Sequence, residues 1–87
     1  MQQQGGMAAV SSDNVGELKS VVNAGGYSYM EVLQNGATVW VAAPETQLTV
    51  GEKVTWDAGM VMRNFTAKSL DRTFDEIVFA GAARAIK

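Results

Sequence analysis

The sequence YSYMEVLQNGATVWVAA, at residues 27–43, decides the fold. On each side of Asn35-Gly36 it has the period-two pattern of a β-strand, in which successive side chains point to opposite faces. Asn-Gly is the strongest short hairpin signal, because both central residues of a type I′ turn need a positive φ. The sequence therefore predicts an antiparallel hairpin with strands over residues 27–34 and 37–43.

Shorter β-rich runs flank this hairpin. One lies upstream, at residues 17–22. On the other side, Pro44 ends the hairpin, because proline lacks the backbone N–H that would continue the ladder. Short strands at turn-like spacing, with no amphipathic helix, are typical of a small barrel or sandwich. We expect an all-β, five-stranded Greek-key OB-fold barrel, whose remaining strands lie at residues 53–56, continuing over 60–68 after a bulge or loop at Gly59, and 76–80.

The chain of 87 residues has room for a single domain. Residues 1–14 are mostly Gln, Gly, Ala and Ser without a sustained period, so we expect a flexible N-terminal tail. We assign residues 15–81 to the OB-fold domain. The Ala-rich residues 82–87 are expected to form a C-terminal tail, either frayed or as a short helical turn.

Composition excludes several kinds of chemistry. The chain has no His and no Cys, which rules out a Ser-His-Asp triad, a cysteine nucleophile, a zinc site of the usual kind and any disulfide. Its 7 Lys and Arg against 9 Asp and Glu, a net charge of −2, disfavour a general nucleic-acid binder, because phosphate affinity comes mainly from clustered cations. We expect a protein that is not an enzyme and needs no cofactor.

Four blocks of sequence resemble the NrfJ-related small bacterial envelope proteins. This resemblance covers about three quarters of the chain and implies an exported OB-fold domain without an established enzymatic activity. The family commonly has a histidine after the phenylalanine that matches Phe65, whereas this chain has Thr66 there. The four blocks are residues 24–29, 39–44, 59–65 and 70–75.

The resemblance implies a periplasmic or secreted location, with a signal peptide that is not part of this chain. We therefore expect a non-catalytic binding module in the bacterial cell envelope. Its expected partner is another envelope protein or a second copy of the chain, and we expect no membrane span, because no run of 18 or more apolar residues is present.

A soft-metal site is one alternative function. Met60 and Met62 are two residues apart on an expected strand, so both thioethers project from one face, and soft sulfur ligands select Cu(I) or Ag(I). With Trp56 upstream, this run resembles the metal-binding strand of small periplasmic OB-fold copper and silver chaperones. Those proteins add a histidine, which this chain lacks, and their tryptophan is one residue closer. Methionine also fills irregular cores, and core packing is the simpler interpretation.

An aromatic binding face is the other alternative. Tyr27, Tyr29 and Trp40 are expected on one face of the hairpin, where OB domains stack bases or sugars, and Arg63 and Arg72 offer a positive rim. This arrangement suits single-stranded nucleic acid or a glycan. The acidic balance of the chain argues against nucleic acid, and Arg72 has a simpler structural role in an ion pair with a neighbouring aspartate.

Overall fold

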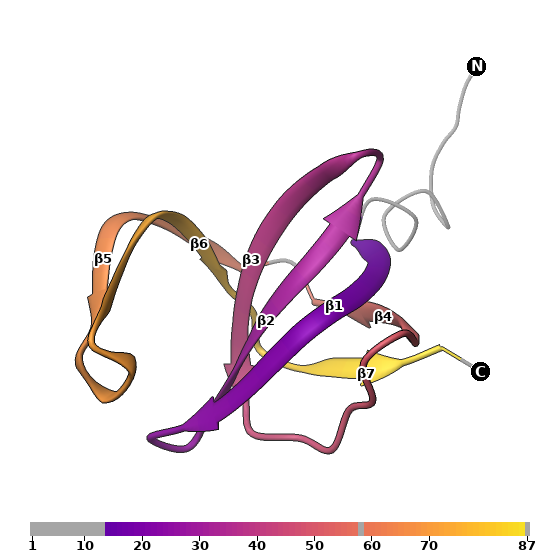
Figure 1. Cartoon of the computed structure of the whole chain (residues 1–87), viewed down its shortest axis with the longest axis horizontal. Helices are drawn as coiled ribbons and strands as arrows, with labels where there is room; N and C mark the ends of the chain where they lie inside the picture. Colours follow the sequence, from indigo (N-terminus) through magenta and orange to yellow (C-terminus); the bar gives the residue numbers. More distant parts are fainter. Residues whose placement is uncertain (1–13, 58, 87) are drawn as a thin grey trace.

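The described part of the chain forms one seven-stranded β-sheet. The structure is a computed structural model that describes residues 14–57 and 59–86, and the strands follow the order β5-β6-β3-β2-β1-β4-β7 across the sheet. All neighbours are antiparallel except β3 and β6, which are parallel. Among the described residues, no helix is long and apolar enough to span a membrane. The strands, shown in Figure 1, are β1 (Val15–Ala24), β2 (Tyr27–Gln34), β3 (Ala37–Pro44), β4 (Lys53–Trp56), β5 (Met60–Ala67), β6 (Arg72–Phe79) and β7 (Ala83–Ala85).

The predicted hairpin is confirmed. β2 and β3 pair in register from Tyr27 opposite Pro44 to Gln34 opposite Ala37, and the turn between them has Asn35 at a φ of 52° and Gly36 at 80°. These positive φ values are the ones that Asn and Gly adopt most easily. The upstream strand pairs with β2 as expected, although β1 is longer than the predicted run.

The all-β prediction is confirmed, whereas the sheet has seven strands rather than five and does not close into a single barrel. β4 and β5 are separate elements on either side of residues 57–59. The last predicted strand starts earlier, at Arg72, because the turn before it is compact: a 3-10 turn, η1 (Lys68–Leu70), followed by Asp71 at a φ of 53°.

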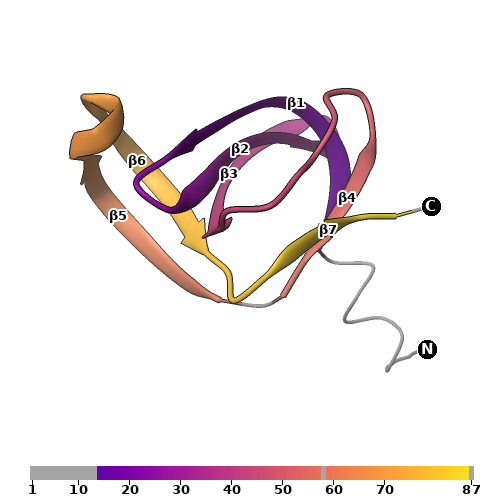
Figure 2. The same ribbon diagram turned by 90° about the horizontal axis from the view of Figure 1, so that it is seen from below.

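A further strand lies in the segment that the sequence analysis assigned to the C-terminal tail. β7 pairs with β4 through Val54 opposite Ala85 and Trp56 opposite Ala83. Ala83 also packs into the first core, but a strand of three residues is too short for its alternation to reveal it in the sequence. Figure 2 shows β7 beside β4, on the side of the sheet away from the β5–β6 hairpin.

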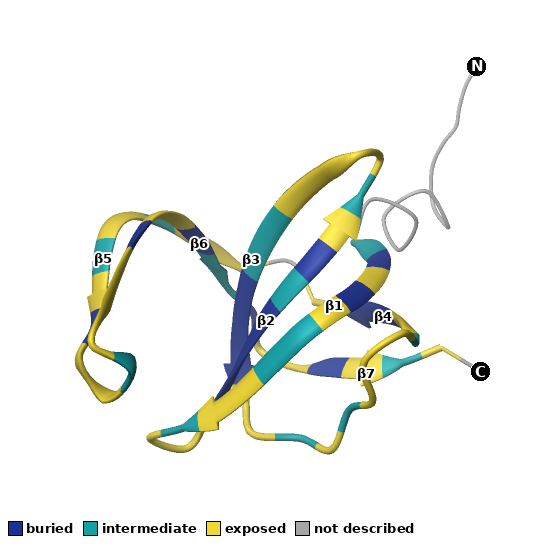
Figure 3. Ribbon diagram, viewed as in Figure 1, coloured by how far each residue is buried: buried dark blue, intermediate teal, exposed yellow. Residues whose placement is uncertain are grey.

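The central strands are buried on both faces. On β2, Met30 belongs to a first core that also contains Leu18, Val54 and Trp56, whereas the adjacent Tyr29 belongs to a second core. Since neighbouring residues of a strand point to opposite faces, the two cores lie on opposite sides of the β2–β3 pair. Figure 3 shows buried residues concentrated on these central strands and β5 largely exposed. The second core consists of Tyr29, Ala42, Ala67, Phe74 and Ile77.

β3 and β6 pair only near their C-terminal ends. Their register consists of Val41 opposite Val78 and Ala42 opposite Phe79, and the Ala80 N–H donates to the Ala42 carbonyl at 2.8 Å. The N-terminal halves of the two strands have no register pairs with each other among the described residues. The β5–β6 hairpin therefore joins the rest of the sheet through a short ladder and through the second core.

Candidate functional site

An open apolar groove runs along β5, the terminal strand of the sheet. It has a volume of about 430 Å³. Three of its residues come from β5 and one from β6, its only neighbouring strand among those described. No lining side chain carries a charge or a hydroxyl group. We call this feature the β5 groove, and it is lined by Met60, Met62, Phe65 and Phe79.

The N-terminal part of β5 leaves large apolar side chains in contact with solvent. Met60 is 66% exposed and Val61 is 47% exposed. Single exposed apolar residues are ordinary on protein surfaces, but contiguous apolar patches mark interaction sites. Here Met60 itself lines the β5 groove, and Tyr27, 39% exposed, lies beside its Phe79 wall, whereas Val61 points to the opposite face of the strand. The feature is therefore a patch rather than scattered single residues.

Aromatic contacts hold the wall of the groove in place. The rings of Phe65 and Phe79 meet edge to face at 4.9 Å between centroids, and the ring of Tyr27 meets Phe79 at 6.0 Å. Edge-to-face pairs of this kind contribute about 0.5–1.5 kcal/mol beyond the burial of their surface. The aromatic wall is fixed by packing, whereas the flexible thioether of Met60 lies exposed at the opening.

Phe65 reaches the groove because β5 is kinked. Simple alternation places Phe65 on the face opposite Met60 and Met62, and the sequence analysis therefore did not group these three residues. In the structure Asn64 has a φ of 52°, which interrupts the alternation and brings Phe65 to the groove side. Asparagine tolerates this conformation better than most residues, so Asn64 was the available signal. No comparable signal pointed to Phe79, which comes from another strand.

The three residues of the predicted soft-metal site lie in two different places. Met60 and Met62 both line the β5 groove, as their spacing predicts. Trp56 is buried in the first core with Met30, on the other side of the central strands. A third thioether ligand could come only from another methionine, and Met7 lies outside the described residues. Within the described part of the chain, no group of three or more Asp or Glu side chains is suited to hold a metal ion.

This placement predicts weak binding of soft metal ions. We expect Ag(I) to shift the methyl NMR signals of Met60 and Met62 only when it is well above stoichiometric concentration, because two thioethers form an incomplete coordination shell. Trp56 fluorescence should stay unchanged. The control is Met60→Leu/Met62→Leu, which keeps the apolar groove and removes both sulfurs. Saturation at one equivalent with quenching of Trp56 would contradict this expectation and favour a metal chaperone.

Tyr27, Tyr29 and Trp40 share one face of the β2–β3 hairpin, as predicted, but side chains of β6 cover much of that face. Tyr29 lies opposite Ala42 and Glu31 opposite Trp40, so these side chains share one face of β2–β3. Tyr29 is only 6% exposed because its ring stacks on Phe74 at 6.2 Å. An open stacking platform for bases or sugars requires exposed rings. Among Tyr27, Tyr29 and Trp40, only Tyr27 is exposed.

The arginines predicted for the rim have separate roles. The Arg72 guanidinium lies 4.3 Å from the ring centroid of Trp40 and 4.7 Å from that of Phe74, a cation–π arrangement in place of the expected ion pair with Asp71 or Asp75. Arg63 forms an ion pair with Glu76 at 3.6 Å, and both side chains are more than half exposed. An exposed pair of this kind contributes little to stability.

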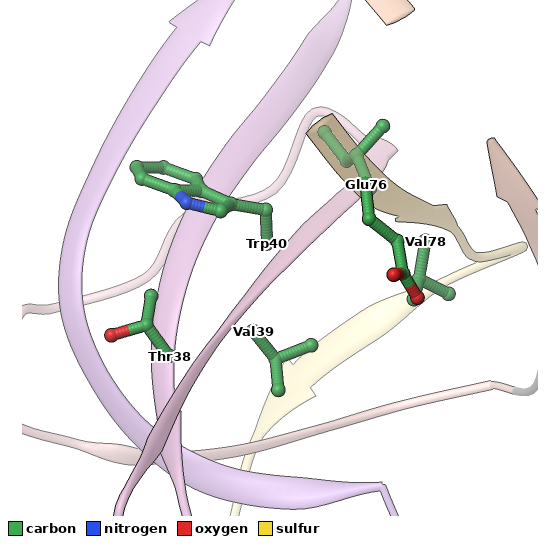
Figure 4. Close-up of a pocket in the computed structure, with 6 residues that line it drawn as sticks. Thr38, Val39, Trp40, Glu76 and Val78 are labelled. Atoms are coloured by element: carbon green, nitrogen blue, oxygen red, sulfur yellow. The ribbon is translucent and has the colours of Figure 1, made fainter. Parts of the chain in front are cut away.

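A more polar pair of hollows lies where β3 and β6 diverge. The larger has a volume of about 310 Å³ and the smaller about 110 Å³, and both include Thr38, Trp40 and Glu76 in their lining. Figure 4 shows the smaller hollow, with Val39 beside Trp40 on β3 and Val78 beside Glu76 on β6. Since Arg72 already lies over the Trp40 ring, one face of this ring is not free for a ligand.

Comparison with known proteins identifies no relative of this chain. No protein-family model matches the chain, and neither the curated proteins nor the solved structures contain a significant match.

Proposed function

We propose that this protein is a non-catalytic, exported binding module whose β5 groove docks a partner protein. The observation that carries the proposal is the groove itself, an open apolar hollow of about 430 Å³ beside a 66% exposed Met60. Leaving this much apolar surface in water brings no gain to a monomer, whereas covering it on binding contributes free energy at about 25 cal/mol per Å².

The chemistry of the groove favours a protein partner over a reaction. Thioethers and phenyl rings neither transfer protons nor act as nucleophiles in the usual enzymatic sense, so the four lining residues provide binding without catalysis. Methionine adapts its shape to different apolar surfaces, and for that reason it is common where proteins bind other proteins. The location in the cell envelope, and hence an envelope protein as partner, comes from the NrfJ-related resemblance of the sequence.

The proposal includes an OB-type barrel as the scaffold. The β1-β2-β3 meander and the parallel pairing of β3 with β6 agree with that topology. β4 pairs with β1 while β5 pairs with β6, and only residues 57–59 separate β4 from β5. We therefore propose that β4 and β5, as two separate strands, together take the place of the one strand that links the two ends of the β1-β2-β3-β6 array in an OB barrel.

Site-specific photocrosslinking tests the docking function. We expect a benzophenone amino acid at position 60 to give a discrete adduct with another protein when the exported chain is irradiated in its native envelope. The matched control is the same amino acid at position 50, because Val50 is 57% exposed but lies in the segment between β3 and β4. Identical adduct patterns from the two positions, or none from position 60, would contradict docking at the β5 groove.

A further inference from the structure

We propose that the free edge of β5 binds an extended segment of the partner by strand addition, and that this segment alternates apolar with acidic side chains. This inference rests on the proposed function and specifies how the partner binds. Strand addition combines backbone hydrogen bonds along a sheet edge with pockets for alternate side chains. The structure provides the edge, the pocket and a charge preference in one place.

β5 is one of the two terminal strands of the sheet, and it is much the longer of them. It has 8 residues, whereas β7 at the other end has 3. β6 pairs with β5 along one edge, and no described strand pairs with the other edge. A long strand edge with unpaired N–H and C=O groups is a template for pairing with another chain.

The backbone groups that point outward can be assigned from the ladder. The Ala80 N–H donates to Ala42 on β3, so even-numbered residues of β6 direct their backbone groups to β3 and odd-numbered residues direct theirs to β5. Met62 lies opposite Ile77 and therefore directs its backbone groups inward to β6. It follows that Val61 and Arg63 present their N–H and C=O groups at the free edge.

The side chains at the start of β5 point to two faces, one apolar and one that carries Val61 and Arg63, with Glu76 of β6 beside Arg63. Met60 and Met62 point to the β5 groove, whereas Val61 and Arg63, the residues between and after them, point to the opposite face. A strand added to this edge places its alternate side chains in the same two directions. One set would enter the apolar groove, and the other set would lie beside Arg63.

The local charge of β5 determines which partner side chains are preferred beside Arg63. Residues 59–70 contain Arg63 and Lys68 and no Asp or Glu, although the whole chain has a net charge of −2. The Arg63 side chain is 74% exposed, and its 3.6 Å contact with Glu76 is an exposed pair that a partner carboxylate can replace. A second copy paired through the same edge would add like charges instead. The preferred occupant is therefore a segment of another protein, with acidic residues at alternate positions.

Two synthetic peptides test the preference. The probe is acetyl-GEVEIEVEG-amide, which has apolar side chains on one face and carboxylates on the other, and the control is acetyl-GKVKIKVKG-amide. We expect the acidic probe to bind the full chain at least about tenfold more tightly than the basic control at low salt, with the difference falling as salt is added. Amide NMR titration gives both affinities and identifies the residues that shift.

A proline substitution tests the backbone contact. Val61→Pro removes an N–H that faces the free edge and leaves the bonds to β6 in place. We expect it to weaken binding of the acidic probe about tenfold, while the matched control Val61→Ala, which keeps the N–H, changes it less than about threefold. In the unmodified chain, the bound probe should slow hydrogen exchange at Val61 and Arg63 but not at Met62. This second measurement does not depend on the folding of the proline variant.

The outcomes separate this inference from the docking function. Strand addition is overturned if the basic peptide binds as well as the acidic one, if Val61→Pro binds the probe normally, or if no edge amide is protected. A concentration-dependent dimer that Val61→Pro abolishes overturns the commitment to another protein. If position 60 still crosslinks to a partner in the Val61→Pro chain, groove docking stands and strand addition falls. If that adduct never forms, the proposed function itself fails.

Discussion

Gly59→Ala will destabilise the domain by about 3 kcal/mol or more, because no space exists for a side chain at this position. A Cβ added to Gly59 would lie 1.8 Å from the Phe79 carbonyl oxygen and 2.9 Å from the Ala80 Cα. Both are backbone atoms of the strand end that β5 pairs with, so no side-chain rotation relieves the clash. A domain of this length has a total stability of about 4–13 kcal/mol, so the loss is a large share of it.

Gly81→Ala is the matched control, since a Cβ there meets its nearest neighbour, the Asp57 carboxylate, at 3.8 Å. We expect that variant to change the free energy of unfolding by no more than about 0.5 kcal/mol. Urea unfolding followed by the fluorescence of Trp56, which is buried in the first core, measures both variants. Equal stability of the two would contradict the close approach of β5 to the end of β6.

The close approach at Gly59 also matters for the site. Met60 follows directly and lies opposite Phe79, so the contact that excludes a side chain at Gly59 positions the first wall of the β5 groove. In a Gly59→Ala chain that still folds, the start of β5 must move away from β6. Binding of the acidic peptide should then weaken together with stability, whereas Gly81→Ala should leave both unchanged.

The sequence predicted the features that local chemistry determines. The β2–β3 hairpin was predicted to within one residue, because alternation and Asn35-Gly36 act over short distances. The register of the short pairing of β3 with β6 could not be predicted from local patterns, since it joins residues more than 30 positions apart and depends on how the two cores pack. β7 was missed because it has only three residues, too few for a pattern to stand out in the sequence.

The candidate site, too, was predicted only where local spacing along the chain determines it. Met60 and Met62 were grouped correctly by their spacing on a strand, and both line the groove. Phe65 was not grouped with them, because simple alternation places it on the other face and a single positive φ at Asn64 interrupts that alternation. Trp56 is close in sequence but lies in the other core, so proximity along the chain was a poor guide to proximity in space.

Phe74→Ala will cost about 3–5 kcal/mol, the usual loss for removing a buried phenylalanine. Phe74 is 3% exposed and links the hairpin to the central strands: its ring lies parallel to Tyr29 at 6.2 Å and within 5.1 Å of Trp40. The β5–β6 hairpin has only two register pairs with β3, so the second core provides most of its remaining attachment. Phe74→Ala should therefore destabilise mainly the β5–β6 hairpin.

Native-state hydrogen exchange separates this local effect from a general one. In Phe74→Ala, amides of β5 and β6 should exchange faster by a larger factor than those of β1 and β2. The control Val54→Ala removes a fully buried side chain from the first core, at a cost of about 2 kcal/mol, and should speed exchange most at β1 and β4. Binding of the acidic peptide should suffer more in Phe74→Ala, because only that variant loosens the strand that carries the groove. A uniform increase in exchange in both variants would mean that the two cores unfold as one unit, and the hairpin would then not be a separately stabilised binding element.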